Sequence, residues 1–248
     1  MPDPKIILVI PTYNEAENLP RLVSALLLLK TPNLHLLIVD DNSPDGTGGI
    51  ADDLAGAHPD GVAVLHREQK LGLGRAYLHG FRVALEMGAD VVGEMDADFS
   101  HPVEKVPELV ETLKSCDIAL GSRYIKGGSL DEGWPVWRKM LSVFGNIYAR
   151  TILRLPPRDV TGGFRLYRRE TLLGMPLERV RSNGYIFQVE MLYLAHLCGF
   201  RAQEVPFHFA DRKWGESKMS FWIQREAALR VWQVWWAYRD LRRRPPTR

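Results

Sequence analysis

The sequence predicts an α/β protein whose mostly parallel β-sheet is covered by helices on both faces. In the first half of the chain, short runs rich in Val, Ile and Leu alternate with amphipathic helical patterns. These runs are almost continuously apolar, which is typical of parallel strands that are buried on both faces. Four of the runs end in a polar loop, and sheets of this kind bind their ligands beyond the carboxyl ends of the strands.

Each expected element of the first half follows from its own stretch of sequence. Strands are expected at the short apolar runs within 5–10, 34–41, 61–67, 89–98 and 117–124, the first of which is ended by Pro11. Helices that carry an apolar stripe are expected between them, at 19–29, within 42–58 after a turn, at 74–88 and at 103–114.

The second half of the chain is less regular. Helical periodicity covers 134–153 and 186–199, and the latter helix is expected to end at its glycine. A turn and a short strand are expected within 161–170, and 201–220 is expected to form a strand followed by a charged loop.

The composition argues against several classes of protein. The 248 residues are 46% hydrophobic and 25% charged, which suits a globular protein of one large domain or two small ones. The net charge of +2 is too small to indicate nucleic acid, so no such partner is expected. Cys116 and Cys198 form neither a disulfide framework nor a zinc motif, which suits a reducing cytosol. The opening residues do not resemble a signal peptide, and no apolar run reaches the roughly 18 residues of a membrane span.

The segment "GEMDADFSHP" (93–102) carries the clearest chemical signal. If the fourth strand continues to residue 98, Asp96 and Asp98 lie on the same face at its carboxyl end. Two such carboxylates repel each other unless one is protonated or both bind a cation. Mg²⁺ uses one or two carboxylates and shares its other positions with water and phosphate, so a metal site here implies a phosphate-bearing ligand. The alternative is a solvated turn, because Asp and Ser are common in turns.

Basic residues in the later loops suit the same ligand. Arg123, Arg138, Arg212 and Lys218 could bind phosphate oxygens, and arginine does so with two parallel hydrogen bonds. Each of them taken alone could equally be a solvated surface charge. Their position in loops rich in Gly and Trp favours a binding role.

Several motifs together resemble one family. The chain is similar to the dolichol- or polyprenol-phosphate mannose synthases, which are inverting glycosyltransferases of family 2 with the GT-A fold, a Rossmann-like α/β fold. The resemblance runs from about Ile6 to Ser220 and rests on the motifs "VIPTYNEAENLP", "VDDNSPDGT", "KLGLGRAYLHGF", "EMDADFSHP", "GSRY", "TGGFRLYRRE", "NGYIFQVEM" and "DRKWGESKMS". "PTYNE" and Asp-x-Asp are shared widely among nucleotide-sugar transferases, whereas "KLGLG", "DADFSHP" and "DRKWGESK" are narrower.

The resemblance implies a role for each matching residue. The guanosine of GDP-mannose would be held by Pro11, Tyr13, Glu15, Val39 and Asp41. Its diphosphate would be held by Asp96, Ala97 and Asp98, with Asp96 and Asp98 ligating Mg²⁺ or Mn²⁺, and by the loop residues Arg212 and Lys218. The phosphate of a polyprenyl (dolichyl) phosphate acceptor would be held by Arg123, Arg138 and Ser142. The residues expected to act in the transfer itself are Asp98, Arg123, Arg212 and Lys218. Ser100 stands where some relatives have a glutamine that ligates the metal.

The chemistry of the acceptor agrees with these roles. A phosphate is anionic near neutral pH, so it needs no general base, and the site has to position it and offset charge. A metal would offset the charge that grows on the departing GDP. Direct displacement turns an α-linked donor sugar into a β-linked product. Glu94, in a strand position expected to be apolar, is either a third acidic residue near the metal or the partner of a nearby base.

The division of the chain is expected to fall near residue 220. Residues 1–219 would form the GT-A domain, and 220–248 an amphipathic helix and tail that contains four tryptophans and ends in an arginine cluster. Such a helix suits the membrane–water interface, and the alternative is packing onto the domain or a partner subunit. The expected location is therefore peripheral, on the cytoplasmic face of a membrane, with a separate membrane-anchoring subunit left open. A UDP-glucose donor and a non-catalytic nucleotide-sugar-binding subunit are the alternative functions.

Overall fold

The structure, a computed structural model, describes residues 3–210 and 221–243, with only the backbone described at 221–228 and 243. A seven-stranded sheet forms its centre, in the order β3-β2-β1-β4-β7-β5-β8. The strands are β1 (Ile6–Thr12), β2 (Leu34–Asp40), β3 (Val62–His66), β4 (Val91–Glu94), β5 (Ile118–Ser122), β7 (Arg165–Arg168) and β8 (Ala202–Pro206). β7 is antiparallel to β4 and β5, and the other pairings of the sheet are parallel. The prediction of a mostly parallel sheet is confirmed.

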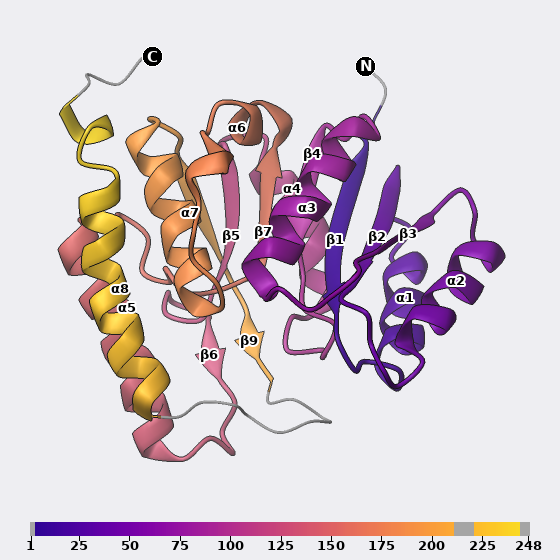
Figure 1. The fold of residues 1–248 in the computed structure, drawn as a ribbon, viewed down its shortest axis with the longest axis horizontal. Coiled ribbons are helices and arrows are strands. Elements are labelled where there is room, and N and C mark those ends of the chain that lie inside the picture. The colour runs from indigo at the N-terminus through magenta and orange to yellow at the C-terminus, as the bar shows by residue number, and fades with distance from the viewer. Residues whose placement is uncertain (1–2, 211–220, 244–248) are drawn as a thin grey trace.

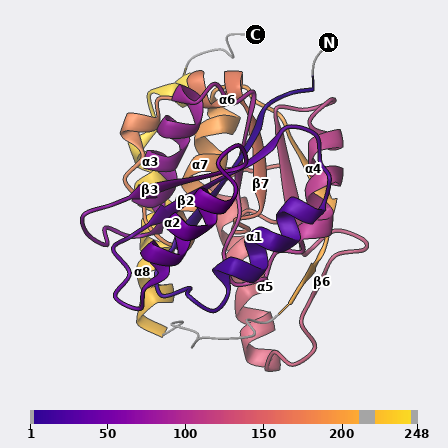
Figure 2. The ribbon, with the colours of Figure 1, turned by 90° about the vertical axis from the view of Figure 1, so that its right-hand side faces the viewer.

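Helices cover both faces of the sheet (Figures 1 and 2). One face is covered by α3 (Leu73–Glu86), α7 (Tyr185–Leu197) and α8 (Phe221–Ala237), with the end of α5 (Val136–Leu153). The other is covered by α1 (Leu19–Leu28), α2 (Thr47–Ala57) and α4 (Val106–Thr112). Each face buries its own hydrophobic core, the first core under α3, α7 and α8 and the second under α1, α2 and α4. Successive residues of a strand point to opposite faces, so Ile7 and Val9 of β1 belong to the first core and Leu8 and Ile10 to the second.

Close packing on the first face depends on one glycine of α3. A Cβ atom at Gly80 would lie 2.4 Å from Cγ1 of Val9 and 3.1 Å from Cγ2 of Val39. The absent side chain therefore lets α3 lie directly on β1 and β2, and this contact sets the distance between the helix and the sheet.

The sequence did not predict the short elements of the second half. A second, two-stranded sheet pairs β6 (Ser129–Leu130) with β9 (His208–Phe209). α6 (Arg169–Leu173) and the 3₁₀ helices η2 (Leu177–Arg179) and η3 (Leu241–Arg243) are single short turns. A two-residue strand or a single helical turn carries too little periodicity to be recognised from sequence. In the first half, the helix expected at 103–114 begins with the 3₁₀ turn η1 (Val103–Lys105) and continues as α4.

The C-terminal helix α8 packs against α5 and α7. Its residues Val231 and Val234, and Tyr238 just beyond it, are buried in the first core. The guanidinium of Arg179 holds the end of the helix, because its Nη2 donates to the carbonyl of Ala237 (2.8 Å) and both its terminal nitrogens pair with Asp240. The packing alternative is therefore realised on one face of α8. No helix of the described part of the chain is long and apolar enough to cross a bilayer.

Candidate active site

The polar loops meet at one edge of the sheet. β1, β2 and β4 are parallel neighbours, and β5 points the same way because β7 lies antiparallel between β4 and β5. Their carboxyl ends face away from the edge where β1 begins, which lies at the top of Figure 1. The loops after β1, β2, β4 and β5 therefore share this edge, as the sequence predicts.

The geometric argument for the two aspartates needs a correction. β4 ends at Glu94 and not at Asp98, so Asp96 and Asp98 lie in the turn that follows the strand. Phe99, with a φ of 61°, lies within this turn. Their convergence therefore comes from the turn and its contacts, not from the alternation of side chains along a strand.

Three neighbours fix the aspartate turn. The hydroxyl of Tyr77 donates to Oδ1 of Asp96 (3.2 Å), and the backbone N–H of Asp96 donates to Nδ1 of His101 (3.1 Å). The backbone N–H of Ser100 donates to Oδ1 of Asp98 (3.0 Å). Burial, followed by the charge of Asp96, raises the pKa of Tyr77 well above its ordinary value, so Tyr77 stays a hydrogen-bond donor at neutral pH.

His101 is a buried, neutral imidazole in this site. Its ring stacks on Phe164 with the centroids 5.0 Å apart, and its Nε2 lies 4.0 Å from Oδ2 of Asp96. Burial lowers its pKa, although the charges of Asp96 and Asp98 oppose that shift. Because Nδ1 accepts a hydrogen bond, the proton sits on Nε2, which faces the Asp96 carboxylate.

The residues of this turn fit a divalent cation. The Asp96 side chain is 32% exposed, whereas Asp98 and Ser100 are buried. The Oγ of Ser100 has no hydrogen-bond partner among the described residues, so a further hard oxygen donor is available there. No group of three or more His, Cys, Asp or Glu residues that could hold a metal occurs in the described part of the chain. Mg²⁺ bound through one or two carboxylates and a ligand's phosphates does not need such a group.

The structure decides between the alternatives for Glu94. Its buried carboxylate accepts hydrogen bonds from the hydroxyl of Tyr167 (2.8 Å) and from Nε2 of Gln188 (2.5 Å), and Arg165 is its register partner on β7. Burial raises the pKa of Glu94 to about 7, and the nearby charge of Arg165 offsets only part of this effect. Glu94 is thus a partner within the sheet and not a third carboxylate of the turn.

The residues expected to hold guanosine lie along the ends of β1 and β2. Asn18 Nδ2 donates to the Glu15 carboxylate (2.7 Å), and the Tyr13 ring lies under Lys70, with the ammonium 3.3 Å from the ring centroid. Pro11 pairs with Val39, which is fully buried in the core, so its side chain is not available to a ligand.

Asp41, at the end of β2, forms a buried ion pair with Arg67. Burial raises the pKa of Asp41, although the Arg67 guanidinium opposes that shift. Asp41 therefore already has a buried, charged partner within the protein.

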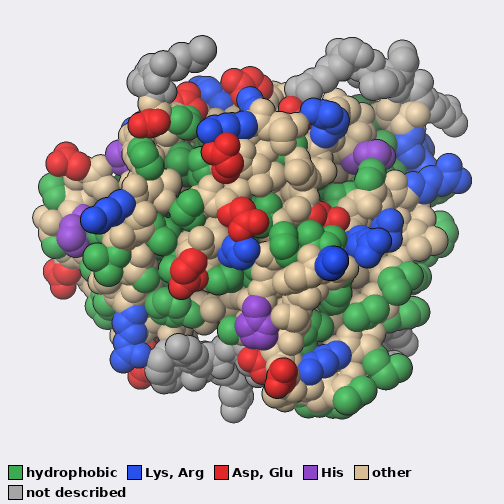
Figure 3. Space-filling model, turned by 180° about the vertical axis from the view of Figure 1, so that it is seen from behind, with side chains coloured by type: hydrophobic (Ala, Val, Ile, Leu, Met, Phe, Trp, Pro, Cys, Tyr) green, Lys and Arg blue, Asp and Glu red, His purple; other side chains and the backbone are tan. Residues whose placement is uncertain are grey.

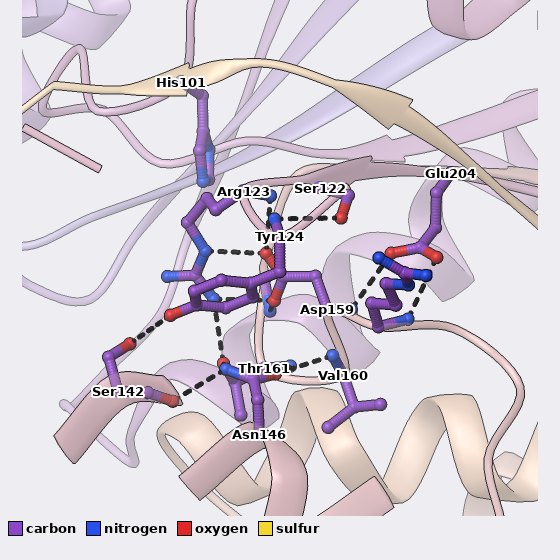
Figure 4. Close-up of polar contacts among 12 residues, drawn as sticks. His101, Ser122, Arg123, Tyr124, Ser142, Asn146, Asp159, Val160, Thr161 and Glu204 are labelled. Atoms are coloured by element: carbon purple, nitrogen blue, oxygen red, sulfur yellow. Dashed lines mark hydrogen bonds and ion pairs between the residues drawn. The ribbon is translucent and has the colours of Figure 1, made fainter. Parts of the chain in front are cut away.

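Arg123 lies at the end of β5 in a dense polar network (Figure 4). Its Nε and Nη2 each donate to a different oxygen of the buried Asp159 carboxylate, both over 2.7 Å. Its Nη2 also donates to Oγ1 of Thr161 (2.8 Å), and its backbone N–H donates to Asp159 (2.9 Å). Burial alone would raise the pKa of Asp159, but the charge and hydrogen bonds of Arg123 outweigh burial and lower it.

The other residues expected near the acceptor lie on or beside α5. Ser142 shares a hydrogen bond of 2.7 Å with the hydroxyl of Tyr124, and the Arg138 guanidinium lies 3.6 Å from the ring centroid of Trp134. Ser142 and Arg123 are thus linked through the neighbouring Tyr124. Arg212 and Lys218 lie outside the described residues.

Sequence reasoning missed several residues of the site. Tyr77 was part of a recognised motif but received no role, and Asp159, Thr161 and Asn146 were not identified as site residues. The only available signal was the run "DVTGG" (159–163), in which an aspartate and a threonine precede two glycines. Such a run is common in turns, so it does not by itself distinguish a site from a loop.

Comparison with known proteins identifies the family. Residues 7–173 match the family described as glycosyl transferase family 2. The chain belongs to this family. It is 46% identical over 231 residues to the polyprenol monophosphomannose synthase of Mycolicibacterium smegmatis, covering 93% of this chain and 86% of that protein. It is 47% identical over 227 residues to the undecaprenyl-phosphate mannosyltransferase of Micrococcus luteus, covering 92% of each.

Solved structures support the same fold. A mannosyltransferase of Pyrobaculum calidifontis in complex with GDP-Man and Mn²⁺ is 20% identical, with a TM-score of 0.63, and the match covers 92% of this chain and 64% of that one. A glucosyl-3-phosphoglycerate synthase of Mycobacterium tuberculosis in complex with Mn²⁺, UDP and phosphoglyceric acid is 18% identical, with a TM-score of 0.64 and coverage of 98% and 80%. The predicted GT-A fold is therefore confirmed.

Proposed function

We propose that this family member transfers mannose from GDP-mannose to a polyprenyl phosphate, releasing GDP and a polyprenyl β-D-mannosyl phosphate. The observation that carries the proposal is the position of His101. Its Nε2 lies 4.0 Å from Oδ2 of Asp96, and its ring contacts the ring of Phe209, with the centroids 6.2 Å apart. The guanidinium of Arg123 lies 5.3 Å from the centroid of the same Phe209 ring. The carboxylate turn suited to a metal-bound diphosphate and the arginine suited to an anionic acceptor therefore border the same buried imidazole. Figure 4 shows His101 pointing toward Arg123.

The residues of the chain would divide the work between donor and acceptor. Bound at Asp96 and Asp98 with the donor's diphosphate, Mg²⁺ or Mn²⁺ would offset the charge that grows on the departing GDP. Tyr77 donates to the Asp96 carboxylate, and Nδ1 of His101 accepts the backbone N–H of Asp96, so the two side chains fix both ends of this residue. Arg123, with Arg138 and Ser142, would hold the acceptor phosphate so that one of its oxygens attacks the anomeric carbon opposite the GDP oxygen. The new bond forms as the bond to GDP breaks, which inverts the configuration.

Exposed apolar side chains support a membrane surface as the place of reaction. One side of α5 presents a helical stripe of large exposed residues: Val136, Trp137, Met140, Val143, Phe144 and Ile147. Figure 3 shows hydrophobic side chains gathered at the lower right, where α5 lies. Trp232 and Trp236 are exposed on the adjacent α8, and Nε1 of Trp232 donates to the hydroxyl of Tyr148 of α5 (3.0 Å). A polyprenyl chain stays in the bilayer, so these helices would hold the phosphate-binding loops at headgroup level.

Two of the aromatic and basic residues of the tail are not part of this surface. Trp235 packs partly against the core, and the Arg242 guanidinium lies 3.7 Å from its ring centroid, so neither extends freely from the helix. Within the described residues, the interfacial surface that we propose combines α5 with Trp232 and Trp236. Peripheral binding at the cytoplasmic face, with or without a membrane-anchoring subunit, is part of the proposal.

The proposed function is tested by a transfer assay with several donors. Purified full-length protein would be incubated with a short polyprenyl phosphate, Mg²⁺ or Mn²⁺ and radiolabelled GDP-mannose or UDP-glucose. The lipid would then be extracted and counted. We expect label in the lipid only from GDP-mannose, as an alkali-stable β-linked product. If only UDP-glucose labels the lipid, the donor is UDP-glucose and not GDP-mannose. Donor binding without any transfer would favour a non-catalytic subunit.

A further inference from the structure

We propose that Asp159 is a positioning residue for the acceptor phosphate, acting by holding the Arg123 guanidinium in one orientation. The inference deepens the proposed function, because it rests on Arg123 as the acceptor's phosphate ligand. Arg123 and Asp159 are 36 positions apart in sequence, and the carboxylate accepts three hydrogen bonds from Arg123, two from the guanidinium and one from the backbone. It accepts a fourth from the backbone N–H of Gly162 (3.1 Å).

This arrangement leaves one edge of the guanidinium for a ligand. Asp159 and Thr161 take up Nε and Nη2 of Arg123, whereas Nη1 donates no hydrogen bond to any described residue. A guanidinium clamped along one edge cannot rotate about its last torsions, so its remaining donors keep a fixed direction. Ordering this long side chain before the ligand arrives removes an entropic cost from binding.

Two further side chains, those of Glu204 and Asn146, keep Asp159 and Thr161 in place. The Glu204 carboxylate of β8 accepts the backbone N–H groups of Arg158 (2.9 Å) and Asp159 (3.0 Å). Thr161 Oγ1 accepts a second hydrogen bond from Nδ2 of the buried Asn146 on α5 (3.0 Å), and Oδ1 of Asn146 accepts the backbone N–H of Val160 (2.8 Å). Figure 4 shows that these side chains join the end of β5, the 158–162 loop and α5 in one network.

The network also connects Arg123 to α5, the helix that carries the exposed apolar stripe. Asn146 and Ser142 are one turn apart on the inner side of α5, opposite Phe144 and Ile147 of that stripe. The hydroxyls of Ser142 and Tyr124 form one link to the Arg123 strand, and Asn146 and Thr161 form the other. The orientation of Arg123 is therefore tied to α5, and Asp159 fixes the arginine at the other end of the network.

A simple structural ion pair predicts the opposite effect on phosphate binding. If Asp159 only neutralised a buried arginine, Asp159→Asn would leave more positive charge near the acceptor and strengthen phosphate binding. If Asp159 orients Arg123, the same change removes an acceptor from Nε or Nη2 and weakens phosphate binding. The two outcomes differ in sign.

The experiment compares three variants of the full-length protein. Asp159→Asn removes the charge, Thr161→Val removes the hydroxyl that accepts from Arg123, and Thr161→Ser keeps that hydroxyl. Asp240→Asn, which breaks the surface ion pair with Arg179, is the control for general destabilisation. The measurements are the dissociation constant of a short polyprenyl phosphate by calorimetry, that of GDP-mannose with Mn²⁺, and the KM for the lipid acceptor.

We expect Asp159→Asn and Thr161→Val to weaken lipid-phosphate binding and raise the acceptor KM by about tenfold, as for the loss of one hydrogen bond to a charged group. Donor affinity should stay within about twofold, which is close to the smallest change that such free-energy arguments resolve. Thr161→Ser should restore most of the acceptor affinity, and Asp240→Asn should leave both ligands unaffected. Unchanged or tighter acceptor binding in both Asp159→Asn and Thr161→Val would overturn the inference. A parallel loss of donor binding, acceptor binding and Tm in these variants would also overturn it.

The outcome is separable from that of the proposed function. If Asp159→Asn does not fold, the comparison of Thr161→Val with Thr161→Ser decides the question alone. If the wild type transfers no mannose but binds the lipid phosphate, weaker binding by Thr161→Val still supports the role of Asp159 and Thr161. If the wild type does not bind lipid phosphate at all, the inference fails together with the acceptor side of the proposed function.

Discussion

Helix α8 has one buried face and one exposed face, and mutations on the two faces should have different effects. Val234 and Tyr238 are 3% and 0% exposed and lie one turn apart, whereas Trp236 is 59% exposed. We predict that Val234→Ala and Tyr238→Phe lower the free energy of unfolding, and that Trp236→Ala instead weakens membrane binding.

The expected magnitudes follow from what each substitution removes. Val234→Ala deletes two buried methyl groups, each worth about 0.8 kcal/mol in transfer, and leaves a small cavity, so about 2–3 kcal/mol is expected. Tyr238→Phe removes the hydroxyl that donates to the buried Glu190 carboxylate over 2.8 Å. A hydrogen bond to a charged group contributes about 1.5–3 kcal/mol. Trp236→Ala is a surface change and should stay within about 0.5 kcal/mol.

Urea unfolding followed by far-UV circular dichroism measures the three free energies, and sedimentation with anionic vesicles measures membrane binding. The buried-face variants should unfold at lower urea and still sediment, because their exposed tryptophans are unchanged. Wild-type stability in both Val234→Ala and Tyr238→Phe would refute the packing of α8 on α5 and α7. Loss of stability in Trp236→Ala with unchanged sedimentation would refute the proposed membrane surface.

This packing also changes what truncation should do. The sequence suggests that residues 1–219 fold alone, but removing α8 would expose the surfaces of α5 and α7 that Val231, Val234 and Tyr238 cover. We therefore expect a chain that stops at residue 220 to be strongly destabilised, and not merely unable to bind vesicles.

Three further predictions concern the site. Asp98→Ala should abolish transfer and weaken metal-dependent donor binding, and full wild-type activity in excess EDTA would contradict the proposed metal site. Arg138→Ala should raise the KM for the lipid phosphate while the GDP-mannose dissociation constant stays near that of the wild type; the reverse pattern would move Arg138 to the donor side. Because Arg123 outweighs burial and leaves the pKa of Asp159 below its ordinary value of 3.8, the stabilisation by this pair is complete above that pH and is lost as the pH falls through the lower folded pKa. The difference in unfolding free energy between wild type and Asp159→Asn should therefore be constant from about pH 5 to about pH 7 and should shrink as the pH falls below 3.8. A difference that grows in acid would contradict the assignment.

Local pattern was enough to predict the frame of the fold. Apolar runs and helical periodicity identified β1, β2, β3 and β5 and the helices between them, because each such element buries a face that its own sequence marks. The rule that parallel strands end at one edge then brought Asp96 and Arg123 to the same side of the sheet. Their family motifs indicated the chemistry.

Contacts between distant segments decided the rest. The sequence by itself determined that a carboxylate pair and Arg123 follow parallel strands, since strand periodicity and polar loops are local properties. Only the tertiary structure decided that β7 enters antiparallel beside β4, which gives Glu94 its partners, and that Asp159 reaches Arg123. It also decided which face of α8 is covered. Burial, pairing and pKa depend on which groups approach across the fold, and no local pattern specifies that.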